Sequence, residues 1–208
     1  LTQALATGAR NRGAEIYRNT NVVGIKQTKN GWVVETDKGS IECEHVMSCS
    51  GNFARQTGKM VGLEIPVIPV EHQYIVTEPH PEIQKRKKEG LPEMGVLRDS
   101  DSRWYMREEA GGLILGPYED GAPCCYVDGP SKDSEYELFQ EDLDRLAPHI
   151  EGAIHRVPAF GEVGVKKVYN GAICYTPDGN PIVGPAWGLK NFWINEGHSF
   201  GITAAGGA

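Results

Sequence analysis

The chain has 208 residues, 39% of them hydrophobic and 24% charged, which is the balance of a globular protein large enough to bury a core. The net charge is −7, the basic residues are scattered apart from Lys85–Lys88, and no run approaches the roughly 18 apolar residues of a membrane span, so neither a nucleic acid nor a membrane is expected as a partner. Five cysteines at irregular spacing favour a reducing compartment, the cytoplasm or a eukaryotic mitochondrial matrix, and predict no metal site.

The first part of the chain predicts a helix, a small antiparallel meander and a second helix. Helix composition extends from Leu1 to about Gly13. Strand-like segments follow at 14–17, 22–28, 32–36 and 40–43. Asn30-Gly31 is the strongest short hairpin signal. Val46–Gly51 then has the pattern of a short buried strand that ends in glycine, before a helix at 53–61.

A second region begins at residue 65 with two proline-flanked segments, 65–70 and 73–77. The polar, proline-punctuated stretch from Glu78 to Gly95 predicts an exposed excursion. Strand-like pieces return at 104–107 and 113–115, and the last forty residues carry strand signals at 165–169, 171–174, 181–183 and 192–195. A turn is predicted at 176–179.

An amphipathic helix is predicted from Ser134 onward. One helical stripe holds Phe139, Leu143, Leu146 and Ile150. Ser134 and Glu137 match a capping box at the start of this helix, and Pro148 is expected to end or kink it.

Two segments of small residues could approach a ligand with their backbone. Ser48–Gly51 is a strand that ends in glycine, and Gly197–Gly201 leads into a predicted helix. The alternative for each is a glycine required only by a tight turn. Neither GxGxxG, the P-loop pattern nor GxSxG occurs, so neither a complete phosphate site nor a serine-hydrolase site follows from the residues.

A histidine and a strand face offer a second kind of chemistry. His72 stands in an apolar, β-branched run, where it could bind a carboxylate or move a proton near neutral pH. Arg103, Tyr105 and Arg107 alternate along a strand and suit an anionic substrate. The alternatives are a half-buried structural histidine and a solvated strand face.

Taken together, these segments resemble the dimethylglycine and sarcosine dehydrogenases, within the wider D-amino-acid-oxidase-like flavoprotein group, over essentially the whole chain. The matching stretches include VMSCSGNFARQTGKMVGLEIPVIPVEHQYIVTE, LRDSDSRWYMRE, NGAICYTPDGNPIVGP and NEGHSFGITAAGG. The resemblance implies a mixed α/β (α+β) fold with part of a glutathione-reductase-type FAD-binding domain and an antiparallel-sheet substrate domain. Residues 1–64 and 166–208 are then expected in the FAD-binding domain and residues 65–165 in the substrate domain.

The resemblance also implies FAD as cofactor and oxidation of an N-methylated glycine, dimethylglycine or sarcosine, by hydride transfer to flavin N5. The catalytic residues of the family fall on His72 and Tyr105, and Arg107 is a candidate for holding the substrate carboxylate. The flavin contacts would fall on Val22, Ser50, Gly51, Gly171, Gly197, His198, Ser199, Gly201 and Ile202.

Two departures from the family qualify this interpretation. The glycine-rich phosphate-binding unit of the family lies upstream of the matching stretch, and its tetrahydrofolate-binding portion lies downstream, so we expect a fragment truncated at both ends that does not hold FAD tightly by itself. Two alternatives stay open. One is a non-catalytic interaction protein resembling the regulatory subunit of pyruvate dehydrogenase phosphatase, and the other is a related amine or amino-acid oxidase.

Overall fold

A computed structural model describes residues 1–135 and 137–208, which form two compact units. The first unit comprises Leu1–Ile68, Tyr126–Pro130 and Cys174–Ala208, and the second comprises Pro69–Cys125 and Ser131–Ile173. The fold is mixed α/β with antiparallel sheets, which confirms the predicted class. Which segments bind FAD and which bind substrate stays a prediction.

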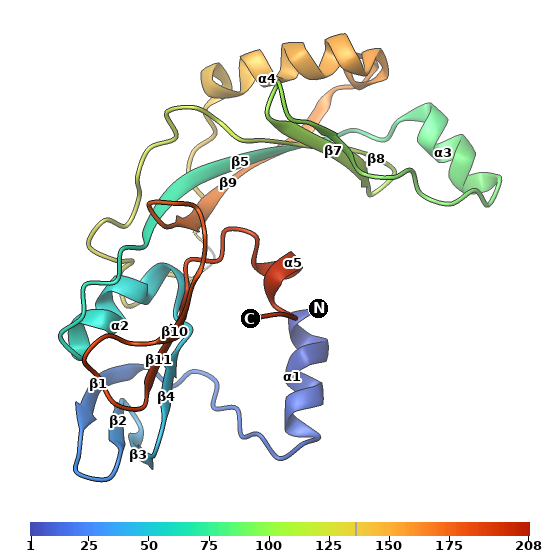
Figure 1. Ribbon diagram of the computed structural model, residues 1–208. Coiled ribbons are helices and arrows are strands. Elements are labelled where there is room, and N and C mark those ends of the chain that lie inside the picture. The colour runs from blue at the N-terminus through green and yellow to red at the C-terminus, as the bar shows by residue number, and fades with distance from the viewer. Residues whose placement is uncertain (136) are drawn as a thin grey trace. The chain divides into compact units, whose positions relative to one another are not determined.

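The first unit opens with helix α1 (Thr2–Arg10) and a three-stranded antiparallel meander of β1 (Val22–Gln27), β2 (Trp32–Thr36) and β3 (Gly39–Cys43), as predicted (Figure 1). Gln27 pairs with Trp32 across the predicted hairpin. Residues 14–17, however, form no strand. Ile16 and Tyr17 are exposed, and an extended segment is not stabilised as a strand without a partner for its backbone groups.

The second sheet of this unit brings together segments far apart in the sequence. Strand β4 (Val46–Ser48) lies parallel to β11 (Phe192–Glu196), which pairs antiparallel with β10 (Ile182–Pro185). The short helix η1 (Gly51–Phe53), then α2 (Ala54–Met60), follow β4, and α5 (Gly201–Ala204) follows β11. Trp32 and Phe192 pack edge to face, with ring centroids 5.2 Å apart, so the meander and the second sheet share a core.

The second unit is built on a five-stranded sheet with the order β6-β7-β8-β5-β9. Its strands are β5 (Ile68–Thr77), β6 (Leu97–Asp99), β7 (Trp104–Glu109), β8 (Gly112–Pro117) and β9 (Val165–Tyr175). Strands β7 and β8 were predicted, whereas β6 was not. Strand β5 is continuous where two segments, 65–70 and 73–77, were predicted, and β9 is continuous where 165–169 and 171–174 were predicted.

The exposed excursion predicted for 78–95 contains helix α3 (Pro81–Lys88). The His80 side chain caps it by accepting a hydrogen bond from the Glu82 N–H, and Pro81 stands in the first turn, where its missing N–H costs nothing. Histidine is not among the usual capping residues, which is why this helix was missed.

Helix α4 (Leu143–Arg156) begins at Leu143 rather than at Ser134, because Asp142 provides the cap by accepting from the Arg145 N–H. The predicted capping box is wrong: the Phe139 N–H instead donates to the Asn170 carbonyl in β9. Tyr136, within the predicted helix, lies outside the described residues. Pro148 does not end α4, since the helix continues to Arg156 with Leu146 and Ala153 buried on the sheet.

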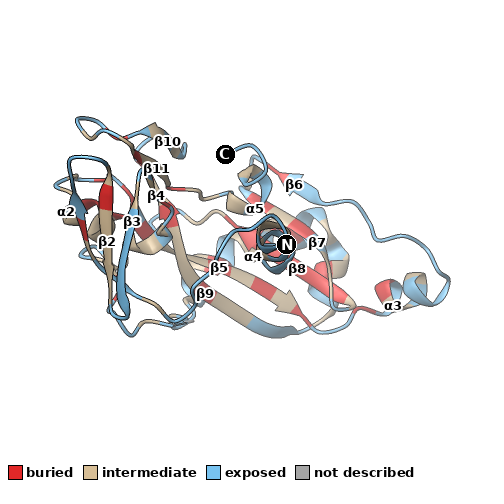
Figure 2. Ribbon diagram, turned by 90° about the horizontal axis from the view of Figure 1, so that it is seen from below, coloured by how far each residue is buried: buried red, intermediate tan, exposed pale blue. Residues whose placement is uncertain are grey.

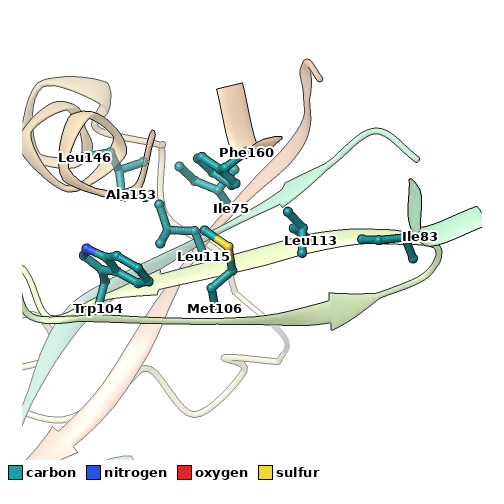
Figure 3. Close-up of a cluster of buried hydrophobic side chains, with 9 residues drawn as sticks. All are labelled: Ile75, Ile83, Trp104, Met106, Leu113, Leu115, Leu146, Ala153 and Phe160. Carbon is teal, nitrogen blue, oxygen red and sulfur yellow. The ribbon is translucent and has the colours of Figure 1, made fainter. Parts of the chain in front are cut away.

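The core of the second unit fills the space between α4 and one face of the sheet (Figure 3). It consists of Ile75, Ile83, Trp104, Met106, Leu113, Leu115, Leu146, Ala153 and Phe160. Figure 2 shows the buried positions concentrated on the strands, with exposed segments at α3. Because side chains alternate along a strand, the neighbours of these residues point to the other face of the sheet.

Three general features concern the described residues, 1–135 and 137–208. No helix among them is long and apolar enough to cross a membrane. No group of three or more histidine, cysteine, aspartate or glutamate side chains among them could hold a metal ion. None of the five cysteines, all of which are described, forms a disulfide with another described residue.

Candidate active site

Three rings lie in a row on the sheet face opposite α4. Trp104 and Met106 of β7 point into the core, so Tyr105 between them points away from it. His72 of β5 and Tyr118, directly after β8, complete the row. The ring centroids are 5.8 Å apart for His72 and Tyr118 and 6.1 Å for Tyr118 and Tyr105. The structure therefore brings His72 and Tyr105 onto one surface, with Tyr118 between them.

Gly116 makes room for the Tyr105 ring. It pairs with Tyr105 across β7 and β8, and a Cβ atom at this position would fall well under 3.0 Å from three atoms of the phenol. A side chain at position 116 would therefore push the ring away from the strand. Arg98 lies over the Tyr118 ring, 5.5 Å from its centroid, so a cation also borders the row.

The β5 backbone beside His72 is held by a buried carboxylate. Glu119 accepts hydrogen bonds from the Gln73 N–H and Nε2, both at 2.9 Å. Gln73 Oε1 in turn accepts from the Asp142 N–H at 2.7 Å, and Arg145 Nε lies 3.2 Å from Glu119. This network ties the start of α4 to the strand that carries His72.

Burial shifts both candidate catalytic groups towards their neutral forms. It lowers the pKa of His72, and the charge of Glu119 opposes this only in part. It raises the pKa of Tyr105, reinforced by Tyr118. At neutral pH a neutral imidazole can accept a proton or a hydrogen bond, and a neutral phenol can donate a hydrogen bond.

A cavity of about 570 Å³ opens on the same sheet face. Tyr105 and Arg107 line it, and His72 is not among its lining residues. Its walls include Tyr74 and Tyr169, which stack at 4.8 Å. Lys167 Nζ stands 4.4 Å from the centre of the Tyr169 ring. The nearby cations suit the negative group of a small ligand, and the aromatic faces attract a positive one.

Arg107 is already engaged by an acid within this cavity. Its Nη1 lies 2.5 Å from Glu109 Oε2, and both side chains are about 40% exposed, at 43% and 40%. An anionic ligand would therefore have to compete with Glu109 for the guanidinium. Arg103, the other arginine predicted on this strand face, forms a bidentate ion pair with Asp120.

In the first unit, a buried glutamate joins the ends of β4 and β11. Glu196 is 1% exposed. Its carboxylate accepts from Ser48 Oγ at 2.6 Å, the Ser50 N–H and Oγ at 2.7 Å, and the Gly51 N–H at 2.8 Å. The Ser50 and Gly51 amides are thus already used and cannot also serve a phosphate. Gly51 has φ +57°, and a Cβ there would meet no atom within 4 Å, so the space beside it is open.

His198 offers an unused polar atom next to this junction. Its Nε2 lies 2.5 Å from Asn195 Oδ1, whereas its buried Nδ1 has no hydrogen-bond partner among the described residues. Gly197 precedes it with φ +76°, a conformation that favours glycine. An unpaired buried nitrogen that directly follows this glycine fits a ligand with polar atoms, such as a flavin.

The remaining predicted flavin contacts are spread more widely. Ser199, Gly201 and Ile202 follow His198, and Ile202 is 81% exposed. Val22 begins β1 in the meander, a different sheet of the same unit. Gly171 belongs to β9 in the second unit. Ser50 and Gly51 are connected with the end of β11 by hydrogen bonds to Glu196.

Sequence reasoning missed four residues of the ring row and its neighbouring cavity: Tyr74, Tyr118, Tyr169 and Lys167. Tyr169 and Lys167 have the period of two expected for one strand face, and this pattern could have flagged them. Tyr118 follows the end of β8 and has no such signal. It joins the row only because β8 lies between β5 and β7.

Comparison with known proteins gives a consistent result. Residues 1–208 match the family described as FAD dependent oxidoreductase. The chain is 41% identical over 213 residues to dimethylglycine dehydrogenase, mitochondrial, of Mus musculus, covering 100% of the chain and 24% of the relative. Identity to the sarcosine dehydrogenase, mitochondrial, of the same organism is 34%, covering 94% of the chain and 21% of the relative.

Among solved structures, L-proline dehydrogenase from P. horikoshii aligns with a TM-score of 0.74 at 26% identity. The alignment covers 95% of this chain and 49% of that one. The chain spans about a quarter of the length of the two curated dehydrogenases that it matches. From the match over its full length, the chain belongs to the family of FAD-dependent oxidoreductases.

Proposed function

We propose that this chain is part of an enzyme that oxidises an N-methylated glycine, dimethylglycine or sarcosine. The observation that carries the proposal is the row of His72, Tyr118 and Tyr105 on one sheet face, beside an aromatic and cationic cavity. FAD, when bound, would supply the electron acceptor, with hydride passing from the N-methyl group to flavin N5. Its phosphates would be held outside these residues.

His72 and Tyr105 would act on the substrate amine. Such a substrate is a zwitterion, and its amine must lose a proton before the N-methyl group can be oxidised. A neutral His72 is suited to accept that proton, and the Tyr105 hydroxyl to orient the amine or the carboxylate by a hydrogen bond. Arg107 would bind the carboxylate, with Lys167 as a nearby second cation.

Eight of the nine proposed FAD contacts lie in the first unit, and Gly171 lies in the second. The proposed contacts are Val22, Ser50, Gly51, Gly171, Gly197, His198, Ser199, Gly201 and Ile202. Support is strongest for His198, because its buried Nδ1 is unpaired among the described residues. For Ser50 and Gly51 the proposed contact runs through the open side of the turn, since Glu196 holds their amides. Tetrahydrofolate as a second partner, and a mitochondrial location in a eukaryote, are proposed from the relatives alone.

The test uses the natural protein that contains these residues, loaded with FAD, under anaerobic conditions. Dimethylglycine and sarcosine should each bleach the flavin absorbance, at rates that reveal the preferred substrate. His72→Gln and Tyr105→Phe should slow bleaching by about a hundredfold, within the range typical of a lost acid–base group. Tyr17→Phe is the control, because it removes a hydroxyl from an exposed tyrosine that does not line the cavity.

Two outcomes would contradict the proposal. A flavin that is bound but not bleached by either amine would favour the non-catalytic interaction protein. Bleaching that is equally fast in the His72 and Tyr105 variants would place the chemistry elsewhere in the protein.

A further inference from the structure

A second cavity, of about 400 Å³, lies in the second unit between α3, strands β6 and β7, and the segment after α4. Its walls are mainly apolar and include Ile83, Met94, Leu97, Met106, Leu113 and Val157. Met106 and Leu113 belong to the core under α4, so this cavity adjoins the opposite side of the sheet from the ring row. Its volume lies within the range of roughly 300–1,000 Å³ found for small-molecule sites.

A buried histidine in this cavity has an unpaired donor. His80 is 2% exposed, and its Nδ1 accepts from the Glu82 N–H at 3.2 Å. The neutral ring must therefore carry its proton on Nε2. That nitrogen is buried and has no hydrogen-bond partner among the described residues. The nearest acid, Glu162, lies 3.6 Å away, beyond hydrogen-bond distance.

A second donor lines the same cavity. Arg86 uses its Nη2 to bind the Pro92 carbonyl at 3.0 Å, but its buried Nε has no hydrogen-bond partner in the described chain. Glu108 Oε1 stands 3.9 Å from that nitrogen and accepts instead from the Met94 N–H. Buried donors are costly to leave unpaired, so two in one cavity indicate a missing acceptor.

Charge decides what kind of acceptor fits. Arg86 and Arg107 contribute two positive charges to the lining, and Glu82 and Glu108 contribute two negative ones. A balanced, largely apolar cavity gives no net attraction to an ion. We infer that it binds a small, neutral, mainly apolar molecule whose carbonyl oxygen accepts a hydrogen bond from His80 Nε2, with Arg86 Nε as a second donor. No residue of the ring row lines this cavity, although Arg107 borders both cavities.

Three matched compounds test the inference on the natural protein that contains these residues: acetophenone, benzoate and ethylbenzene. They share a ring but carry a neutral carbonyl, a carboxylate and no acceptor, respectively. Binding is followed by NMR, using the methyl signals of Met94 and Met106 and the His80 ring nitrogens. Acetophenone should shift all of these saturably, and the other two compounds should bind about tenfold more weakly, the equivalent of one hydrogen bond.

Two variants separate the site from general surface affinity. His80→Asn keeps a good helix cap but removes the Nε2 donor, and it should weaken acetophenone binding about fivefold to tenfold. Ala159→Phe should fill the cavity and abolish binding. Tyr74→Phe, on the other sheet face, should change nothing. The inference is overturned if acetophenone fails to bind up to its solubility limit, if ethylbenzene or benzoate binds as tightly, or if both cavity variants bind like the wild type.

Discussion

Replacing Gly116 with alanine should impair catalysis by displacing Tyr105. The new Cβ would lie well under 3.0 Å from Cζ, Cε1 and Oη of the phenol, whereas ordinary contact begins at 3.4 Å. The ring must therefore move by about 1 Å, and a misplacement of that size can cost about a hundredfold in rate. This corresponds to about 2.7 kcal/mol of transition-state stabilisation. Gly116 is not among the residues with positive φ, so alanine adds no backbone strain.

The assay is kcat/KM for dimethylglycine in the FAD-loaded protein, with Gly164→Ala as control, because a Cβ at Gly164 would meet nothing within 4 Å. A double mutant isolates the cause. In a Tyr105→Ser background the clash no longer exists, so Gly116→Ala should then cost almost nothing further. Wild-type kcat/KM in Gly116→Ala, or an equal loss with and without the Tyr105 ring, would refute the reasoning.

Three other predictions follow from burial. Because burial lowers the pKa of His72, its neutral form should persist to below pH 6.5, and kcat/KM should decrease only below that pH. His72→Gln should remove this decrease. A His72-dependent decrease that begins above pH 6.5 would contradict the prediction. Glu119→Ala leaves the buried Gln73 and Arg145 groups without their acceptor and should lower the free energy of unfolding, measured in urea, by about 3–5 kcal/mol. The control Glu35→Ala, in the exposed pair with Lys26, should lower it by less than about 1 kcal/mol. Equal losses would argue against the network. Burial raises the pKa of Cys125 to about 11, so only about a thousandth of this thiol should be ionised at pH 8. Mass spectrometry should therefore find slow alkylation of Cys125 that becomes faster as the pH rises. Rapid alkylation of Cys125 at pH 8 would contradict the prediction.

Local sequence patterns were sufficient to predict the elements whose hydrogen bonds join residues close together in the sequence. The meander follows from alternating strands around Asn30-Gly31, and β2 matches its predicted bounds. Strands β7 and β8 likewise follow from alternation around Gly111-Gly112. The face that carries Tyr105 could also be read from the sequence, because side chains on a strand alternate by geometry alone.

Tertiary contacts decided the elements where local signals competed. Ser134 and Glu137 match the sequence pattern of a capping box, but the Phe139 N–H donates to the Asn170 carbonyl, and α4 begins after Asp142 instead. The same holds for the candidate site. His72 and Tyr105 were found from the resemblance, but Tyr118 between them and Gly116 beneath the phenol were not. Their positions depend on which strands are neighbours, and strand order is set by packing of the whole sheet against α4, a property that no short stretch of sequence encodes.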